Sequence, residues 1–460
     1  MKTILISNVL LYKERKDVLI EGNKIKAVEP AGTFETDKTN GREGKTSGRE
    51  GKTSGETELV SRVADRAGRV ADKVIDGAGK AIIPGFVNAH AHSAMTLFRG
   101  VGEDVPLDQW LRERIWPYEA KLDEEMVYWG AKLACVEMIR TGTTTFNDMY
   151  WHLNGCKRAA EEMGLRSVQS FTWLDHFDDQ TIEENKKQLK LAHKESAHWS
   201  SLTTFAISPH AIYTVAEKSF RYINSYAKDN DLLVHTHLAE TRAEMDQAER
   251  EYGMSPTEYM NKLGLMNPNL IAAHSLWLSS DDIKILGSNG VHTVHNPNSN
   301  LKLASGYKFK YNELRDAGAN VCLGTDGCAS SNNLDMIDSM KAAALLQKVW
   351  RNDPGATPLK ELMDVASLNG AKALRLKAGK VEPGYLADIA LVDMERPSFV
   401  PNHYFLANLV YAANGECIDT VICDGKIIME NQYIPGQEEI FRKVQEVADK
   451  VVDYKKRKKK

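Results

Sequence analysis

Eight short apolar segments, many of them separated by helical patterns, run through the middle of the chain and restrict the folds it can adopt. They are residues 81–90, 143–149, 166–173, 203–210, 232–240, 270–275, 291–296 and 320–326. The helical pattern is clearest after Asp123, an N-cap residue, and it stops at Thr141 and Gly142. Eight strand–helix units over roughly 300 residues predict an α/β fold, a (β/α)8 barrel of the TIM type. An open doubly wound sheet is the alternative, weakened because no G-x-G-x-x-G turn follows the first strand.

Strand-rich regions lie on both sides of this middle part. The first region lies near the N-terminus and has two strand patterns, the second of which contains the turn signal Gly22–Asn23. The second region consists of residues 387–394 and 420–433, and Asp424–Gly425 is its turn signal. We predict that both regions build one small β-sandwich domain. The expected organisation is residues 1–83 and 378–440 for the β-sandwich, 84–377 for the barrel, and 441–460 for a C-terminal helix and a basic tail.

A charged stretch follows the N-terminal strands, and the segment GREGKTS at 41–47 is repeated at 48–54. A phosphate-binding loop needs a glycine five residues before each G-K pair, but Thr39 and Thr46 occupy those positions, so this motif is excluded. The seven-residue step lacks the apolar positions of a coiled coil. We expect a flexible insertion at about residues 36–73.

Composition excludes several classes of protein. The 59 Lys and Arg against 63 Asp and Glu give a net charge of −4, which is too acidic for a dedicated nucleic-acid coat despite the basic residues 455–460. No apolar run reaches the roughly 18 residues of a membrane span. The N-terminal apolar stretch contains Ser7 and Asn8 and lacks a cleavage site, so we predict an edge strand rather than a signal peptide. Six cysteines without a C-x-x-C pair indicate reduced thiols and a cytoplasmic protein.

Side chains that can bind a metal ion stand at the ends of five predicted strands. His90 and His92 share one face of the first strand, but an H-x-H pair alone is also explained by ordinary core or surface histidines. The further strand-end residues are His210, His237, His274 and Asp326. Because the C-terminal strand ends of a barrel open on one face, we expect these side chains to meet there and bind a metal ion.

Taken together, these segments resemble the amidohydrolase superfamily, and within it the subgroup of 5′-methylthioadenosine/S-adenosylhomocysteine deaminases. The resemblance lies in PGFVNAHAHSAMTLFRG (84–100), HTHLAET (235–241), AHS (273–275), HNPNSNLKLASG (295–306) and LGTDG (323–327). It covers nearly the whole chain apart from the insertion and the basic tail. The resemblance implies a metal-dependent hydrolase that converts the 6-amino group of a 5′-modified adenosine to a carbonyl and releases ammonia.

The resemblance also implies one divalent metal ion, with His90, His92, His237 and Asp326 as its ligands. Superfamily members with two metal ions commonly carry a carboxylated lysine at the end of the fourth strand, whereas residues 207–210 here contain no lysine. Three imidazoles and one carboxylate suit Zn²⁺, with Fe²⁺ and Mn²⁺ as alternatives. Such an ion lowers the pKa of its bound water towards about 7.

Three residues receive catalytic roles. Glu240 is expected to move protons to the ring nitrogen and to the leaving ammonia, the alternative being a carboxylate placed at a helix start. His274 is expected to orient the water as a base or electrostatic partner, the alternative being a buried structural histidine. Asp326 can accept the proton of the water. The P-C-x-x-C zinc site of cytidine deaminases is absent from the sequence.

Substrate contacts also follow from the resemblance. Glu119 corresponds to the acid that binds the ribose hydroxyls, and a carboxylate can accept hydrogen bonds from both. His210 corresponds to the residue that contacts the adenine ring, and Trp110 is a candidate pocket wall; Glu240 and Asp326 also face the substrate. The alternatives are a surface acid, a structural histidine and a core aromatic residue.

One segment departs from the family pattern. Relatives that accept S-adenosylhomocysteine hold its carboxylate with arginines after the third strand, but residues 170–185 here contain no Arg or Lys. A buried carboxylate without a cationic partner is costly. We therefore expect 5′-deoxyadenosine, 5′-methylthioadenosine and adenosine as substrates, with S-adenosylhomocysteine a weaker one.

Other functions remain open from the sequence. Within the same subgroup, the chain could be a guanine deaminase or a chlorohydrolase-like amidohydrolase. In a different class, it could be a nucleic-acid-associated protein with a structural metal, which is disfavoured because structural sites have no neighbouring general acid. We expect a nucleoside as substrate, no nucleic-acid or membrane partner, and a homo-oligomer, which the resemblance suggests is a tetramer.

Overall fold

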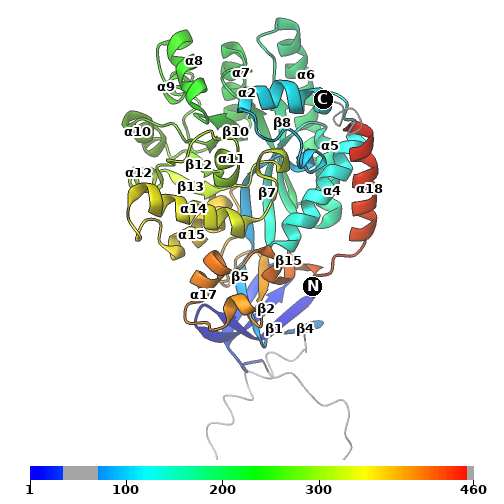
Figure 1. Ribbon diagram of the computed structural model, residues 1–460. Coiled ribbons are helices and arrows are strands. Elements are labelled where there is room, and N and C mark those ends of the chain that lie inside the picture. The colour runs from blue at the N-terminus through cyan, green and yellow to red at the C-terminus, as the bar shows by residue number, and fades with distance from the viewer. Residues whose placement is uncertain (35–70, 453–460) are drawn as a thin grey trace, which may run out of the picture.

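The computed structural model describes residues 1–34 and 71–452 (Figure 1). A barrel with its helices forms the larger part of the protein, and a β-rich part made from both chain ends lies below it in this view. The predicted insertion at about 36–73 falls almost wholly outside the described residues, although Lys73 already begins a strand. The basic residues 455–460 also lie outside them.

Eight parallel strands form the barrel in sequence order, which confirms the predicted α/β barrel fold. They are β6 (Phe86–Ala91), β7 (Thr143–Tyr150), β8 (Arg166–Trp173), β9 (Thr203–Pro209), β10 (Leu233–Leu238), β11 (Leu270–His274), β12 (His292–His295) and β13 (Asn320–Leu323). Hydrogen bonds link the first strand, β6, to the residues that follow the last strand, β13. The Asn88 side chain donates to Thr325 Oγ1 at 2.6 Å, and the Asp326 amide donates to the His90 carbonyl at 3.0 Å.

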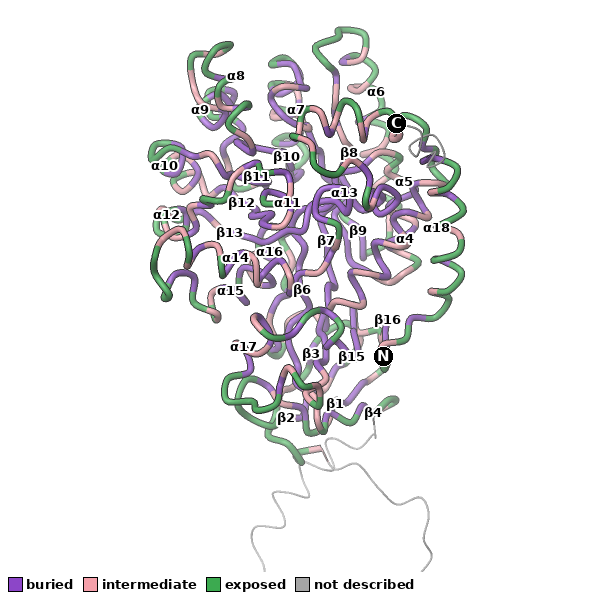
Figure 2. Tube along the Cα trace, in the orientation of Figure 1, coloured by how far each residue is buried: buried purple, intermediate pink, exposed green. Residues whose placement is uncertain are grey.

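Helices surround the strands, whose residues are buried along most of their length (Figure 2). The helices after the strands are α4 (Glu124–Arg140), α5 (Leu153–Met163), α6 (Asp179–Ser196), α7 (Glu217–Asp229), α8 (Arg242–Tyr252), α9 (Pro256–Lys262), α10 (Ser280–Ser288), α11 (Pro297–Lys302), α12 (Tyr311–Asp316), α13 (Cys328–Ser331), α14 (Met336–Arg351), α15 (Leu359–Ala366) and α16 (Leu368–Ala373). Helix α4 begins as predicted, because the Asp123 side chain accepts from the Met126 amide.

The first predicted strand, residues 81–90, is in fact two strands. β5 (Lys80–Pro84) belongs to the β-rich part, and β6 starts the barrel two residues later. Pro84 has no amide hydrogen to continue a ladder. Gly85 passes so close to Thr144 that a β-carbon there would collide with its side chain. An apolar run alone does not reveal such a change of sheet.

Both chain ends contribute to one mixed eight-stranded sheet. Its strands are β1 (Thr3–Leu11), β2 (Glu14–Glu21), β3 (Lys24–Pro30), β4 (Lys73–Asp76), β5, β14 (Ile389–Asp393), β15 (Ile418–Cys423) and β16 (Lys426–Met429). β5 and β14 join the two halves, with Pro84 opposite Ile389 in an antiparallel pair. Gly22–Asn23 and Asp424–Gly425 lie in the connections between neighbouring strands, as predicted.

A buried ion-pair group joins this sheet to the bottom of the barrel. The Arg166 guanidinium, at the start of β8, contacts Asp388 at 2.9 Å and Asp424 at 2.9 Å. Helix α18 (Gln437–Val451) starts earlier than the expected residue 441, since Gly436 adopts a left-handed backbone immediately before it. The limits of the domains stay a prediction. No helix among residues 1–34 and 71–452 is long and apolar enough to cross a membrane.

Candidate active site

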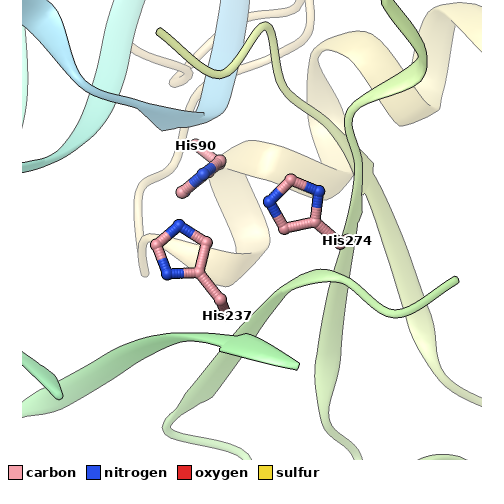
Figure 3. A group of neighbouring side chains, drawn as sticks. All are labelled: His90, His237 and His274. Atoms are coloured by element: carbon pink, nitrogen blue, oxygen red, sulfur yellow. The ribbon is translucent and has the colours of Figure 1, made fainter. Parts of the chain in front are cut away.

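The candidate metal ligands come together at the C-terminal end of the barrel. Figure 3 shows the rings of His90, His237 and His274 turned towards one another from three strands. One ligand atom from each of these three lies within 4.8 Å of the others, and the same holds for His90, His92 and Asp326. The strand-end positions therefore gather imidazoles and a carboxylate in one place, as the sequence pattern predicts.

Two of these residues have an unusual backbone. The φ angles of His274 and Asp326 are 68° and 62°, in the left-handed region that residues other than glycine rarely adopt. Backbone hydrogen bonds hold both turns, including one from the Ser275 amide to the Leu238 carbonyl at 2.8 Å. Strained backbone of this kind concentrates at functional sites.

The hydrogen bonds of His92 and His237 determine which of their nitrogens are free. His92 Nδ1 donates to the Met149 carbonyl at 2.6 Å, and His237 Nδ1 donates to the His210 carbonyl at 2.9 Å. A carbonyl can only accept, so both Nε2 atoms of the neutral rings carry lone pairs. These two Nε2 atoms lie 3.3 Å apart. Two lone pairs at this distance repel unless a proton or a metal ion lies between them. Two nitrogens about 2.0–2.1 Å from a tetrahedral ion would be about 3.4 Å apart, which is close to the observed distance.

Asp326 completes this group. Its Oδ1 lies 3.2 Å from His92 Nε2 and 3.5 Å from His90 Nε2, and its Oδ2 accepts from the Ser299 hydroxyl at 2.6 Å. Burial alone would raise the pKa of Asp326, but the neighbouring imidazoles of His90 and His92 hold it well below its usual range. An ionised carboxylate beside converging imidazole lone pairs fits a divalent metal ion.

Next to this group, His274 and Glu240 face each other. Asn300 donates to His274 Nδ1 at 2.9 Å, so the neutral ring carries its proton on Nε2, which lies 3.7 Å from Glu240 Oε2. Burial lowers the pKa of His274 to about 3 and, with the charges of Asp326 and Glu244, raises the pKa of Glu240 well above its usual range. The pair therefore offers a fixed N–H donor and a carboxyl that holds a proton more readily than an exposed glutamate does.

The predicted substrate residues line the same pocket, which has a volume of about 640 Å³ including space open to solvent. Trp110 and Glu119 enter from η2 (Trp110–Ile115), a π-helical turn, and from α3 (Trp116–Glu119). Burial raises the pKa of Glu119. His210 lies at the end of β9, where its Nδ1 contacts the Thr214 hydroxyl at 2.9 Å. No Lys or Arg is among the described residues that line this pocket.

Several neighbours of the site were not singled out by the sequence patterns. His235, two residues before His237 on the same strand face, contacts His90 Nδ1 at 2.8 Å. Asn300 and Ser299 contact His274 and Asp326 from α11. The second H-x-H pair, His235 and His237, was a signal for the first of these. The roles of the two α11 residues depend on contacts between distant segments, which spacing alone does not encode.

Comparisons with known proteins agree with this arrangement. Residues 81–428 match the amidohydrolase family. The chain is 45% identical over 381 residues to a 5′-deoxyadenosine deaminase of Methanospirillum hungatei, covering 83% of this chain and 85% of the relative. It is 45% identical, again over 381 residues, to 5-methylthioadenosine/S-adenosylhomocysteine deaminase 1 of Archaeoglobus fulgidus, covering 82% and 90%.

A solved structure extends the likeness to the whole fold. An adenosine deaminase from Xanthomonas campestris with bound zinc superposes with a TM-score of 0.85, at 30% identity and with 98% of each chain covered. The matched family range includes all eight barrel strands and the candidate metal ligands. The chain belongs to the amidohydrolase family.

Proposed function

We propose that this enzyme removes the 6-amino group of 5′-modified adenosines by hydrolysis, forming the inosine analogue and ammonia. The observation that carries this proposal is the position of Glu240 and His274 beside the converging Nε2 atoms of His92 and His237. Relatives at 45% identity that are named 5′-deoxyadenosine deaminase and 5-methylthioadenosine/S-adenosylhomocysteine deaminase support the substrate class.

We assign His90, His92, His237 and Asp326 as ligands of one divalent metal ion. Zn²⁺ is the proposed ion, with Fe²⁺ and Mn²⁺ as alternatives, because three imidazoles and a carboxylate suit all three. When bound, such an ion lowers the pKa of water so that hydroxide is available near neutral pH. The Xanthomonas campestris relative with bound zinc supports the choice of metal.

The chain's own groups then move the protons. Glu240, whose pKa is raised, can take the first proton of the water and deliver it to the ring nitrogen beside the attacked carbon. It can then carry the second proton of the water, which Asp326 accepts, to the departing ammonia. His274 donates its Nε2 proton towards the attacking oxygen and so stabilises the charge there. Asp326 is the proposed acceptor for the proton of the water, and its carboxylate is held in place by the Ser299 hydroxyl at Oδ2 and the Gly327 amide at Oδ1.

Substrate recognition is assigned to the outer part of the pocket. Glu119 is proposed to accept hydrogen bonds from the ribose hydroxyls, His210 to contact the adenine ring, and Trp110 to form a wall. Because no Lys or Arg is among the described lining residues, we propose that uncharged 5′ groups are preferred. We propose that 5′-deoxyadenosine, 5′-methylthioadenosine and adenosine are better substrates than S-adenosylhomocysteine.

An ultraviolet assay for conversion of adenine to hypoxanthine nucleosides tests the proposal. The enzyme should act on these nucleosides, and chelation should abolish activity that Zn²⁺ then restores. Glu240→Gln should lower kcat by about 10²–10⁴-fold, since it removes the proton carrier. Inactivity on every nucleoside would instead favour a guanine deaminase or a chlorohydrolase-like enzyme.

The remaining expectations belong with this proposal. A homotetramer and a cytoplasmic location are proposed; the six free cysteines, all buried, support a reducing compartment. We propose no nucleic-acid or membrane partner. A chain without residues 455–460 should keep its activity, whereas a nucleic-acid-associated protein would lose its binding.

A further inference from the structure

His235 stands directly behind one candidate metal ligand. Its Nε2 lies 2.8 Å from His90 Nδ1, and both side chains are fully buried. It lies outside the set of residues that line the substrate pocket. A role for His235 must therefore act through His90.

His90 Nδ1 has a different kind of hydrogen-bond partner from the Nδ1 atoms of His92 and His237. Those two donate to backbone carbonyls, which leaves their Nε2 lone pairs free. An imidazole partner can either accept or donate, so the pair of His90 and His235 has two neutral arrangements. In one, His90 Nδ1 donates to His235. In the other, His235 Nε2 donates to His90, whose own proton then sits on Nε2 and faces Asp326 Oδ1 at 3.5 Å.

We propose that His235 is a positioning residue that fixes the tautomer of His90 by accepting its Nδ1 proton, so that His90 Nε2 can bind the metal ion. This inference rests on the metal centre proposed above. Only the arrangement in which His90 donates leaves a lone pair on Nε2. Metal binding therefore selects one of two positions for the shared proton.

This arrangement has a consequence for His235 itself. When it accepts from His90, its own proton must sit on Nδ1, which is buried and has no hydrogen-bond partner among the described residues. Without a metal ion, electrostatics favour the opposite arrangement, because the His90 Nε2 proton then lies next to the Asp326 carboxylate at 3.5 Å, although the two atoms form no hydrogen bond. The two histidines are thus expected to exchange proton positions as the metal binds.

Three variants of the full-length chain separate positioning from packing. The amide of His235→Gln reaches the place of Nε2 and offers an oxygen acceptor, whereas His235→Leu cannot accept and His235→Asn is one carbon too short. His295→Leu is the matched control, because His295 is also buried in a barrel strand but stacks on Phe309. Zn²⁺ affinity is measured by competition with a chromophoric chelator, and the Tm of the chelated protein reports on folding.

His235→Leu and His235→Asn should weaken Zn²⁺ binding by about 10–100-fold, while His235→Gln and His295→Leu stay within about threefold of the unchanged chain. If the unchanged chain and His235→Leu bound Zn²⁺ with equal affinity, this inference alone would be overturned. The same holds if His235→Gln and His235→Leu lost equal Zn²⁺ affinity while the Tm of the metal-free protein stayed unchanged. If His235→Leu does not fold, the Zn²⁺ affinities of His235→Asn and His235→Gln are compared by the same criterion. Failure of the unchanged chain to bind Zn²⁺ would overturn the metal centre as well.

Discussion

The side-chain amide of Asn300 donates to His274 Nδ1 across 2.9 Å, and this contact keeps the His274 proton on the nitrogen that faces Glu240. Asn300→Asp should reverse the tautomer, because a carboxylate accepts from Nδ1–H. We expect kcat to fall by about 100-fold without loss of bound metal, since His274 is not among the proposed ligands. Steady-state kinetics and metal analysis check this, and an unchanged kcat would remove His274 from the proton chemistry.

Glu119 should matter only for substrates that carry ribose hydroxyls. Hydrogen bonds to a charged group contribute roughly 1.5–3 kcal/mol, so Glu119→Gln should lower kcat/KM for 5′-deoxyadenosine by about 10–100-fold. Turnover of a 2′,3′-dideoxy analogue, which cannot make these bonds, should be unaffected by the substitution. Glu113→Gln, at an exposed position nearby, is the control. Equal losses on both substrates would argue against ribose recognition.

The pocket should discriminate by the charge of the 5′ group. We expect kcat/KM for 5′-methylthioadenosine to exceed that for S-adenosylhomocysteine by at least about tenfold, because no described lining residue can pair with the amino-acid carboxylate. Leu174→Arg would add a cation at the pocket wall and should lower the ratio of kcat/KM for 5′-methylthioadenosine to kcat/KM for S-adenosylhomocysteine. Leu191→Arg, at an exposed leucine of α6, should leave it unchanged. A clear preference of the unchanged enzyme for S-adenosylhomocysteine contradicts this prediction.

Acid should destabilise the protein partly through His292. Burial lowers the pKa of His292 to about 4, whereas an unfolded histidine has a pKa of about 6.5. Between these values the unfolded chain binds a proton that the folded chain does not, so the free energy of unfolding falls as the pH drops from about 6.5 to about 4. The contribution is about 3 kcal/mol at most, at about 1.4 kcal/mol per pH unit.

The measurement is the Tm of the metal-free protein across this pH range, so that acid-induced metal release plays no part. His292→Gln removes one titrating group and should make the Tm fall less steeply with decreasing pH, while buried histidines such as His274, whose pKa is also lowered, continue to contribute. His198→Gln, at an exposed histidine of the same barrel, is the comparison and should not change it. Parallel Tm curves for the unchanged chain and His292→Gln would show that other groups dominate the acid response.

Much of the fold could be predicted because it follows from local patterns. Apolar runs separated by helical spacing predicted eight parallel strands, and the alternation of side chains along a strand placed His90 and His92 on one face. The change of sheet at Pro84–Gly85 was missed, since it depends on a close approach to Thr144, a residue about 60 positions away that no local pattern reveals.

The candidate site also has a part that the sequence predicted and a part that it did not. Positions at strand ends were sufficient to predict that His237, His274 and Asp326 would meet, although their chemical roles stay predictions. The proton positions were beyond sequence reasoning, because they depend on whether a ring nitrogen faces a carbonyl, an amide or another imidazole. His235 and Asn300 make such contacts with His90 and His274.

The pairing of β5 with β14 bears on how the protein is made. During synthesis, strands β1, β2 and β3 leave the ribosome early, but the strands that complete their sheet emerge only after the whole barrel has been translated. Until then, the open edge of β5 is available for wrong partners, a hazard of contacts that are distant in sequence. Assembly of the sheet should therefore be a late step, and premature termination before β14 should leave an aggregation-prone chain.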